Sequence, residues 1–264
     1  MRFGIVIPAY NEAERLPSYA QELCDTFKDS GVNLSITIVD DGSSESNRRA
    51  LLAEVQQIRS TTTGSIFTPV HCLKKNIGKG GAVRAGWDTI SNADYLGFID
   101  ADGSVSAIEV LRVLSMITKG SISANAVFAS RIQMLGYKVK RRFLRHMSGR
   151  LFATIGSILL DYGAYDTQCG FKLLSRSAYN KVKPLLIENG FSFDLELLAA
   201  LFHCRISAVE TPINWHEVGG SKVNLAKDTF RMLLALIRIR KQRKRWLSED
   251  VETSPQGHFQ IDDL

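Results

Sequence analysis

The chain has 264 residues, of which 45% are hydrophobic and 23% charged, with a formal net charge of +6 and an isoelectric point near 9.2. This composition allows a buried core, with one large α/β domain and short appendages. No uninterrupted apolar run reaches the roughly 18 to 20 residues that cross a bilayer, so we expect a soluble or peripheral protein rather than a spanning one. The positive charge favours an anionic partner, which could be a nucleotide, a lipid phosphate, a membrane surface or a nucleic acid.

The N-terminus and the cysteines bear on where the protein works. An apolar run at residues 3–8 is too short for a signal peptide and has no cleavage site, so we expect no export by that route. The cysteines are Cys24, Cys72, Cys169 and Cys204; they lie far apart, form no C-x-x-C pair, and two of them lie in stretches typical of apolar core. We therefore expect reduced thiols and a cytoplasmic protein.

Short apolar runs alternate with helical patterns along the first half of the chain, the layout of repeated βα units. Asn11 followed by Glu14 has the spacing of a helix N-cap and its reciprocal partner, which predicts a helix from there to about Phe27. The sequence therefore predicts an α/β fold with a mostly parallel sheet flanked by helices. Its strands are expected at residues 3–7, 36–39, 66–73, 95–99 and 126–129.

After residue 131 the pattern changes. The expected order is a basic amphipathic stretch, a polar loop, a helix and an apolar run, at residues 137–160, 161–169, 194–203 and 206–209. A last helix has an apolar first half and a densely cationic second half, and a polar, acidic tail follows it. We therefore expect a main domain at 1–224, a basic amphipathic helix at 225–247 and a disordered tail at 248–264.

Polar clusters follow three of the predicted strands, at residues 10–12, 40–43 and 100–103. Open α/β sheets bind their ligands at the carboxyl ends of the strands, so these clusters should share one crevice. Asp100 and Asp102 can both turn toward one hard cation, because Gly103 frees the backbone for a tight turn and carboxylate oxygens suit Mg²⁺ or Mn²⁺. An ordinary surface turn is the alternative for each cluster taken alone.

A glycine-rich segment, residues 78–84, lacks the spacing of a P-loop and lacks the third glycine of a dinucleotide fingerprint, where Val83 stands instead. Both of those interpretations fail. The segment can still be a helix N-terminus that faces an anion, with Lys79 adding charge, or a plain packing turn.

Taken together, the motifs resemble those of family-2 glycosyltransferases, above all the subset that makes polyprenyl-phosphate sugars. The dolichyl-phosphate glucosyltransferase branch is the most similar and the mannosyltransferase branch comes next. The likeness extends over about residues 3 to 224. It is carried by residues 6–12, 39–43, 76–84, 100–103, 130–131, 166–172, 193–197 and 215–222.

The resemblance implies a GT-A fold, inversion at the anomeric carbon, a nucleotide-sugar donor and a role for each matching residue. Asp100, Ala101 and Asp102 would serve the diphosphate and the metal. Asp166 or Asp194 would lie near the sugar, with Asp102 at the reaction centre. Arg131, Gln168 and Lys222 would contact phosphates of donor or acceptor. The residues expected to hold the nucleotide sugar also include Pro8, Ala9, Tyr10, Glu12, Asp40, Asp41 and Lys79.

One departure from the family pattern concerns the donor. The mannose branch often places a glutamine two residues after the second aspartate as a further metal ligand, and this chain has Ser104 there. This weakens the mannose interpretation and favours UDP-glucose over GDP-mannose. A second departure is the missing membrane-spanning segment that many relatives carry, which leaves a soluble sugar acceptor as an alternative to dolichyl phosphate.

The acceptor decides whether a general base is needed. A lipid phosphate is already ionised at neutral pH, so catalysis reduces to positioning and charge stabilisation, whereas a sugar hydroxyl would need a base. Asp166 is the candidate for that base or for a group that orients the donor sugar. Asp194 and Glu196 are about 200° apart on a predicted helix, so at most one can face the crevice, and we expect the other to be solvated.

Basic stretches at residues 138–150 and 227–245 combine lysine and arginine with large apolar side chains, which suits helices that lie on an anionic lipid surface. We therefore expect peripheral association with the cytosolic face of a membrane; a soluble helix with a solvated basic face is the alternative.

Two other classes of protein are alternatives to a glycosyltransferase. A nucleotidyltransferase would carry a basic glycine-rich loop directly after the first strand, but this chain has residues 8–12 at that position. A nucleic-acid-binding module would bind in a salt-dependent way without metal; no nucleic-acid partner is expected.

Overall fold

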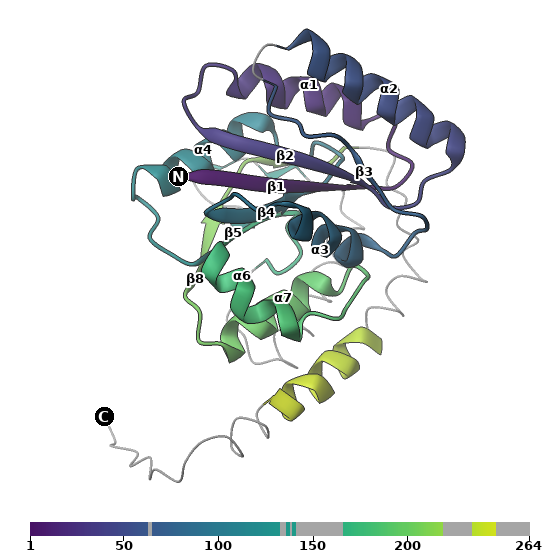
Figure 1. Cartoon of the computed structure of the whole chain (residues 1–264). Helices are drawn as coiled ribbons and strands as arrows, with labels where there is room; N and C mark the ends of the chain where they lie inside the picture. Colours follow the sequence, from purple (N-terminus) through teal and green to yellow (C-terminus); the bar gives the residue numbers. More distant parts are fainter. Residues whose placement is uncertain (63–64, 133–135, 138, 141–165, 219–233, 247–264) are drawn as a thin grey trace, which may run out of the picture.

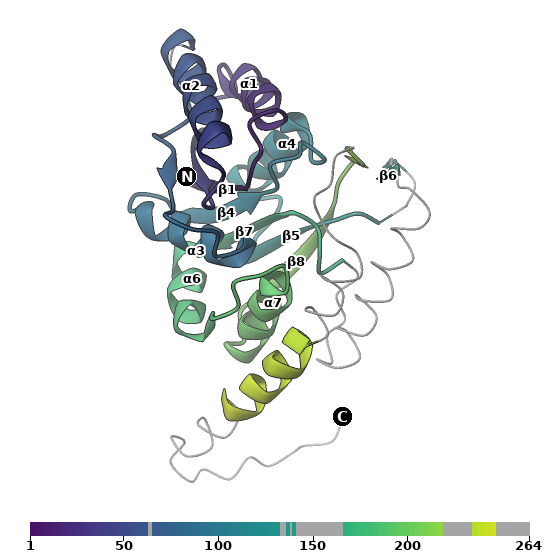
Figure 2. The same cartoon turned by 90° about the vertical axis from the view of Figure 1, so that its right-hand side faces the viewer.

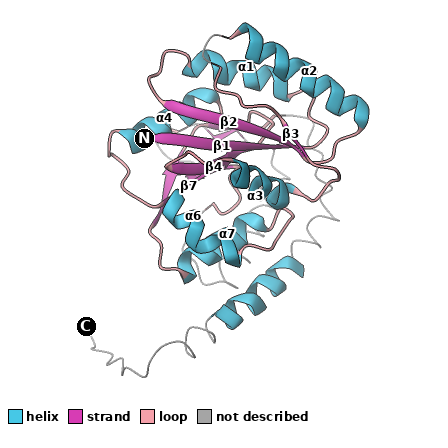
Figure 3. Cartoon of the chain, viewed as in Figure 1, coloured by secondary structure: helices cyan, strands magenta, loops and turns pink. Residues whose placement is uncertain are grey.

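The computed structural model describes residues 1–62, 65–132, 136–137, 139–140, 166–218 and 234–246. In this part of the chain a mixed seven-stranded sheet lies between two layers of helices (Figures 1 and 3). The strand order is β3-β2-β1-β4-β7-β5-β8, and a two-stranded parallel sheet of β6 (Val139–Lys140) and β9 (Trp215–His216) stands apart from it. The predicted α/β architecture is confirmed.

The strands of the main sheet are parallel apart from β7, which runs antiparallel to both of its neighbours, β4 and β5. All the parallel strands on the β1 side end at one edge, so the segments that follow them gather there. The strands are β1 Arg2–Ala9, β2 Asn33–Asp40, β3 His71–Cys72, β4 Tyr95–Ile99, β5 Ala126–Ser130, β7 Phe171–Ser175 and β8 Ala208–Pro212.

Each face of the sheet is covered by its own group of helices. Side chains alternate along a strand, so Ile5 and Ile7 of β1 pack on one face and Val6 on the other. The first face is covered by α1 (Leu16–Phe27), α2 (Glu45–Thr61) and α4 (Ala107–Thr118). The second is covered by α3 (Lys79–Thr89), α6 (Arg176–Val182), the short 3₁₀ helix at Lys183–Leu185, α7 (Phe193–His203) and a helix at residues 234–246 (Figure 2).

Two predicted elements differ from the structure. The helix expected from Asn11 begins only at Leu16, because Asn11 has a φ of +55° and its side-chain oxygen accepts a hydrogen bond from the Ser44 N–H across the turn after β2. The strand expected at 66–73 is reduced to one bridge at Phe67 and the two residues of β3. Pro69 lies between them and has no N–H to continue the ladder.

The sequence interpretation missed β7 and α6. The second of the five residues of β7 is a lysine, Lys172, which interrupts an apolar run, and this is not the pattern of a central strand. Lys172 is nevertheless fully buried, because it finds a carboxylate partner on α7, Asp194, which is distant in sequence. Only the tertiary contact makes this segment a core strand.

The helix at residues 234–246 packs against the second face of the domain. Its Leu236, Ile239 and Trp246 are buried in the same core cluster as α3, α6 and α7, and Trp246 lies 5.3 Å from the His203 ring. The opposite side carries the exposed basic residues Arg240, Lys241 and Lys244. Residues 225–233 and the tail at 248–264 lie outside the described residues. None of the described helices is both long and apolar enough to cross a bilayer.

This docking predicts a contrast between two isoleucines of the same helix. Ile239 is fully buried and Ile237 is 53% exposed. Ile239→Ala should lower the free energy of unfolding by about 2–4 kcal/mol because it leaves a cavity in the core, and Ile237→Ala should change it by less than about 0.5 kcal/mol. Urea unfolding followed by circular dichroism measures both. Equal effects of the two variants would contradict the packing described.

Candidate active site

A cavity of about 950 Å³ opens at the carboxyl ends of β1, β2 and β4, where the N-termini of α3 and α7 also meet. The predicted strand-end clusters therefore share one crevice. The predicted site residues that line it are Pro8, Ala9, Tyr10, Glu12, Asp41, Lys79, Asp100, Ala101, Asp102, Gln168 and Asp194. Asp40, Arg131 and Asp166 do not line it, and Lys222 lies outside the described residues.

Asp100 and Asp102 follow β4 directly. Gly103 has a φ of +71°, the tight turn that the sequence predicted, and Asp102 Oδ1 accepts the Ser104 N–H at 2.9 Å. The Asp100 side chain is 38% exposed toward the cavity. Its backbone is held by the residue just before β7, since the Asp100 N–H donates to the Gly170 carbonyl at 2.9 Å. A Cβ on Gly170 would lie 1.9 Å from Asp100 Oδ2. A side chain at position 170 would therefore displace this carboxylate.

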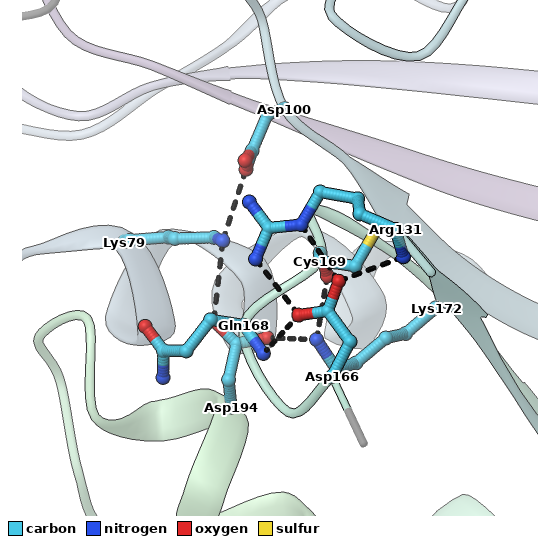
Figure 4. A network of polar contacts seen from close by, with 8 residues as sticks. All are labelled: Lys79, Asp100, Arg131, Asp166, Gln168, Cys169, Lys172 and Asp194. Atoms are coloured by element: carbon cyan, nitrogen blue, oxygen red, sulfur yellow. Dashed lines mark hydrogen bonds and ion pairs between the residues drawn. The ribbon is translucent and has the colours of Figure 1, made fainter. Parts of the chain in front are cut away.

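Four alternating charges connect the core to the cavity (Figure 4). Lys172 Nζ donates to Asp194 Oδ1 at 2.5 Å and to the Cys169 carbonyl at 2.6 Å. Asp194 Oδ2 lies 3.2 Å from Lys79 Nζ, which is also 2.9 Å from Asp100 Oδ1. Burial acts to raise the pKa of Asp194, but the two ammonium groups outweigh it and the pKa is lowered. Burial acts to lower the pKa of Lys79, but Asp100 and Asp194 outweigh it and the pKa is raised.

Arg131 and Asp166 form a second charge pair beside this chain (Figure 4). The guanidinium donates to both carboxylate oxygens at 2.7 and 2.8 Å, and the Arg131 backbone N–H adds a third bond at 2.8 Å. The guanidinium also lies 5.4 Å from the Trp215 ring. Burial acts to raise the pKa of Asp166, but the charge and hydrogen bonds of Arg131 outweigh it, so the pKa is lowered and Asp166 stays an anion.

The two aspartates after β2 have different surroundings. Asp41 lines the cavity, and its oxygens accept the N–H groups of Ile77 and Gly78 at 2.7 and 2.9 Å, which hold the loop before α3. Asp40 is fully buried, with Oδ2 bonded to Arg48 at 2.6 Å and Oδ1 without a hydrogen-bond partner. The pair thus anchors the turns that shape the cavity wall.

One expected orientation was wrong. Asp194 faces the cavity as predicted, but Glu196 is not solvated: it is fully buried and accepts the backbone N–H groups of Ile187 and Glu188 at 2.8 to 3.0 Å. Burial raises the pKa of Glu196, and these hydrogen bonds offset part of the effect. The second carboxylate of α7 therefore holds the loop after the 3₁₀ helix instead of facing water.

Several cavity residues were not predicted. Arg15 pairs with Glu12 at 2.7 Å, and the loop at residues 187–192 forms one wall. Arg238 reaches that loop from the C-terminal helix and donates to both oxygens of Glu188 at 2.8 and 3.1 Å. These residues belong to no strand-end cluster, so spacing in the sequence offers no signal for them. Lys172, which pairs with the cavity residue Asp194, was also not predicted; a lone lysine inside an apolar run was the sequence signal that could have indicated a buried ion pair.

The chemistry of the donor set fits a divalent metal. Asp100 and Asp102 both line the cavity, and carboxylate oxygens are the ligands that Mg²⁺ takes together with water and substrate phosphates. Within the described residues, no group of three or more His, Cys, Asp or Glu side chains gathers as a metal cluster. A metal held here would therefore need the donor's phosphates to complete its coordination.

Comparison with known proteins identifies the family to which the chain belongs. The family profile described as glycosyl transferase family 2 matches residues 4–183, and the chain belongs to this family. It is 34% identical over 248 residues to dolichyl-phosphate beta-glucosyltransferase of Saccharomyces cerevisiae. The matched region covers 90% of this chain and 73% of the yeast protein. The protein of the same name from Dictyostelium discoideum is 31% identical, with the same two coverages.

Solved structures agree on the fold. A complex of glucosyl-3-phosphoglycerate synthase from Mycobacterium tuberculosis with Mn²⁺, UDP-glucose and phosphoglyceric acid superposes with a TM-score of 0.64 at 15% identity, over 90% of this chain and 79% of that one. A complex of that enzyme with Mg²⁺ and UDP has a TM-score of 0.63, with the same identity and coverages. The expected GT-A fold is confirmed.

The ion pair of Asp166 predicts a pH-dependent stability. Because the pKa of Asp166 is lowered on folding, its contribution is complete above the ordinary aspartate pKa of about 3.9 and is lost as the pH falls through the lower folded value. Asp166→Asn should therefore reduce the free energy of unfolding by about 1–3 kcal/mol at pH 7, and the difference from the unmodified protein should shrink below about pH 4.

Urea unfolding at pH 7, 4 and 3 measures this difference, with exposed Asp29→Asn as the control, which should have little effect at any pH. A difference that stays constant across this range would show that Asp166 does not stabilise the fold as an anion.

Proposed function

We propose that this chain transfers glucose from UDP-glucose to the phosphate of a dolichyl or related polyprenyl phosphate. The observation that carries the proposal is the cavity itself. It joins Asp100 and Asp102, Lys79 and an exposed aromatic residue, Tyr10, at the carboxyl ends of strands, where open α/β sheets bind their ligands. The two relatives described above support glucose as the sugar and dolichyl phosphate as the acceptor.

The donor would extend along the cavity from Tyr10 to Asp194. Tyr10 is 44% exposed and offers a ring face for a base, while Pro8, Ala9 and Asp41 form the adjoining wall. Lys79 at the start of α3 is within reach of a diphosphate placed beside Asp100, and a helix N-terminus favours an anion. The nucleoside and the diphosphate would thus be held by different elements of one crevice.

Asp100 and Asp102 would hold Mg²⁺ or Mn²⁺ together with the diphosphate. Such an ion, when bound, offsets negative charge on the departing nucleoside diphosphate. Asp102 keeps one oxygen on the Ser104 N–H, which fixes the direction of its carboxylate. Ser104 itself is buried and its carbonyl accepts the His216 N–H at 3.3 Å.

The transfer needs no strong base. An oxygen of the lipid phosphate forms a bond to the anomeric carbon while the bond to the nucleoside diphosphate breaks and its electron pair leaves with the diphosphate. No proton has to be removed, because the attacking phosphate is already ionised. The state of Asp166 is consistent with a reaction that needs no base, because its carboxylate is engaged by Arg131 and its lowered pKa makes it a poor proton acceptor.

The proposed phosphate contacts are Gln168, which lines the cavity, and Arg131, which belongs to the neighbouring Asp166 ion pair and does not line it. The two oxygens of Asp166 hold the Nε and Nη2 edge of the Arg131 guanidinium, and a planar guanidinium matches phosphate oxygens well. Gln168 lines the cavity and its Nε2 is buried without a hydrogen-bond partner, so a ligand oxygen would satisfy it. Asp194, held between two lysines, would lie near the donor sugar.

A transfer assay tests the proposal. Radiolabelled UDP-glucose, Mn²⁺ and dolichyl phosphate should give an organic-extractable product, and Asp102→Ala should reduce its rate at least about a hundredfold, because a metal and diphosphate contact is lost. Circular dichroism of the variant should remain that of the folded protein.

Competing donors and acceptors make the assay decisive. Extractable label from GDP-mannose alone would overturn glucose as the donor sugar. Label that appears only in water-soluble products, with phosphoglyceric acid or a sugar in place of the lipid, would overturn the lipid acceptor.

We also propose that the protein contacts the cytosolic face of an anionic membrane, where the lipid acceptor resides. Helix 234–246 supports this: one side is packed on the domain, and the other exposes Arg240, Lys241 and Lys244 beside the apolar Ile237. Each basic residue near such a surface contributes roughly 1 kcal/mol of attraction. In Figures 1 and 2 this helix lies on the opposite side of the domain from α1 and α2.

Replacing Arg240, Lys241 and Lys244 together by glutamine should weaken binding to phosphatidylserine-containing vesicles at least about tenfold in a sedimentation assay. The matched control replaces three exposed basic residues of the α1, α2 and α4 layer, Lys28, Arg49 and Lys119, by glutamine and should bind as before. Equal losses in the two triple variants would indicate general charge attraction and contradict a membrane-facing helix.

A further inference from the structure

Lys79 occupies a position in the cavity where its ammonium group and a metal ion would contact the same carboxylate. Its ammonium bonds to Asp100, one of the two carboxylates that fit a metal, at 2.9 Å. Donor binding would bring a second cation to Asp100, and two cations close to one carboxylate repel each other. Lys79 and a metal ion would therefore compete for Asp100.

Lys79 has a second partner that does not fit a metal in the same way. Asp194 Oδ2 lies 3.2 Å from Lys79 Nζ, and the other oxygen of Asp194 is engaged by Lys172. Lys172 is fully buried and also bonds to the Cys169 carbonyl, so Asp194 is fixed from the core side. Losing the contact with Asp100 would leave Lys79 still attached to Asp194, at the cavity wall.

The charges explain why such an arrangement is stable. Buried carboxylates in a poorly solvated site need a counter-charge. Lys172, Asp194, Lys79 and Asp100 alternate in sign and sum to zero, and the Lys79 ammonium also lies 4.9 Å from the Phe98 ring centre. Lys79 thus supplies part of the counter-charge that Asp100 needs, in a cavity that Asp102 and Asp41 also line.

We propose that Lys79 is a resident counter-cation that neutralises Asp100 until the donor arrives, and that it then exchanges Asp100 for the donor's diphosphate while Asp194 keeps it in place. Lys79 thereby makes metal binding to Asp100 depend on the nucleotide: it weakens binding of the metal alone and strengthens binding of the diphosphate. The inference rests on the proposed nucleoside-diphosphate donor, but not on the acceptor or on sugar transfer.

Binding of Mn²⁺ and UDP measures this directly, by isothermal titration with no acceptor present. Lys79→Met should bind Mn²⁺ alone at least about tenfold more tightly than the unmodified protein, because a competing charge is removed, and UDP in saturating Mn²⁺ at least about tenfold more weakly. The factor by which UDP tightens Mn²⁺ binding should fall accordingly. Lys79→Gln, which keeps donors for both carboxylates without the charge, should behave in the same way if Lys79→Met does not fold.

Two controls separate this role from a general effect of charge. Lys79→Arg keeps the positive charge and should bind Mn²⁺ alone within about threefold of the unmodified protein. Arg238→Gln removes another cavity-lining cation, one that pairs with Glu188 rather than Asp100, and should also leave Mn²⁺ affinity within about threefold.

The proposal is overturned if the neutral Lys79 variants bind Mn²⁺ no more tightly than the unmodified protein, including the case in which no variant binds it detectably. It is also overturned if Arg238→Gln gains as much affinity. Because these measurements involve neither dolichyl phosphate nor transfer of sugar, a failure of the proposed enzyme activity would leave their outcome unaffected.

Discussion

The buried ion pair between Lys172 and Asp194 is the interaction on which the rest of the site depends. A charged lysine in a buried core strand is tolerated only with a close, well-oriented partner, and Asp194 provides it at 2.5 Å. The pair joins β7 to α7. Asp194 also pairs with Lys79 of α3, and Lys79 in turn pairs with Asp100 after β4. The elements that form the cavity are therefore held together by charges, among them residues for which we propose roles in the reaction.

The antiparallel strand β7 has a similar double role. It lies between β4 and β5, and Gly170, just before it, allows the Asp100 carboxylate to occupy space that any side chain would fill. The segment preceding β7 brings Asp166 to Arg131 and Gln168 to the cavity. One short strand thus places groups proposed for both the donor and the acceptor.

Charge pairing also fits the proposed transfer to a lipid phosphate, which needs no general base. Asp166 is engaged by Arg131, Asp194 by two lysines and Glu12 by Arg15, so each of these carboxylates orients a cation. Such a site suits a reaction between phosphates and an activated sugar, in which positioning and neutralisation of charge matter more than proton transfer. The C-terminal helix adds to it from outside the sheet, since Arg238 reaches the cavity wall through Glu188.

The sequence by itself determined the α/β class, the parallel strands, and the gathering of residues 8–12, Asp41 and 100–102 at one edge, because strand and turn patterns are local and parallel strands end together. It also indicated the family through its ordered motifs. The tertiary structure decided what depends on contacts between distant residues: that Asn11 serves the turn after β2 instead of capping a helix, that Glu196 is buried, and that Lys172 belongs to a core strand. Local patterns carry no information about such partners, since a charged side chain can be buried only where the fold supplies the opposite charge or a set of hydrogen-bond donors.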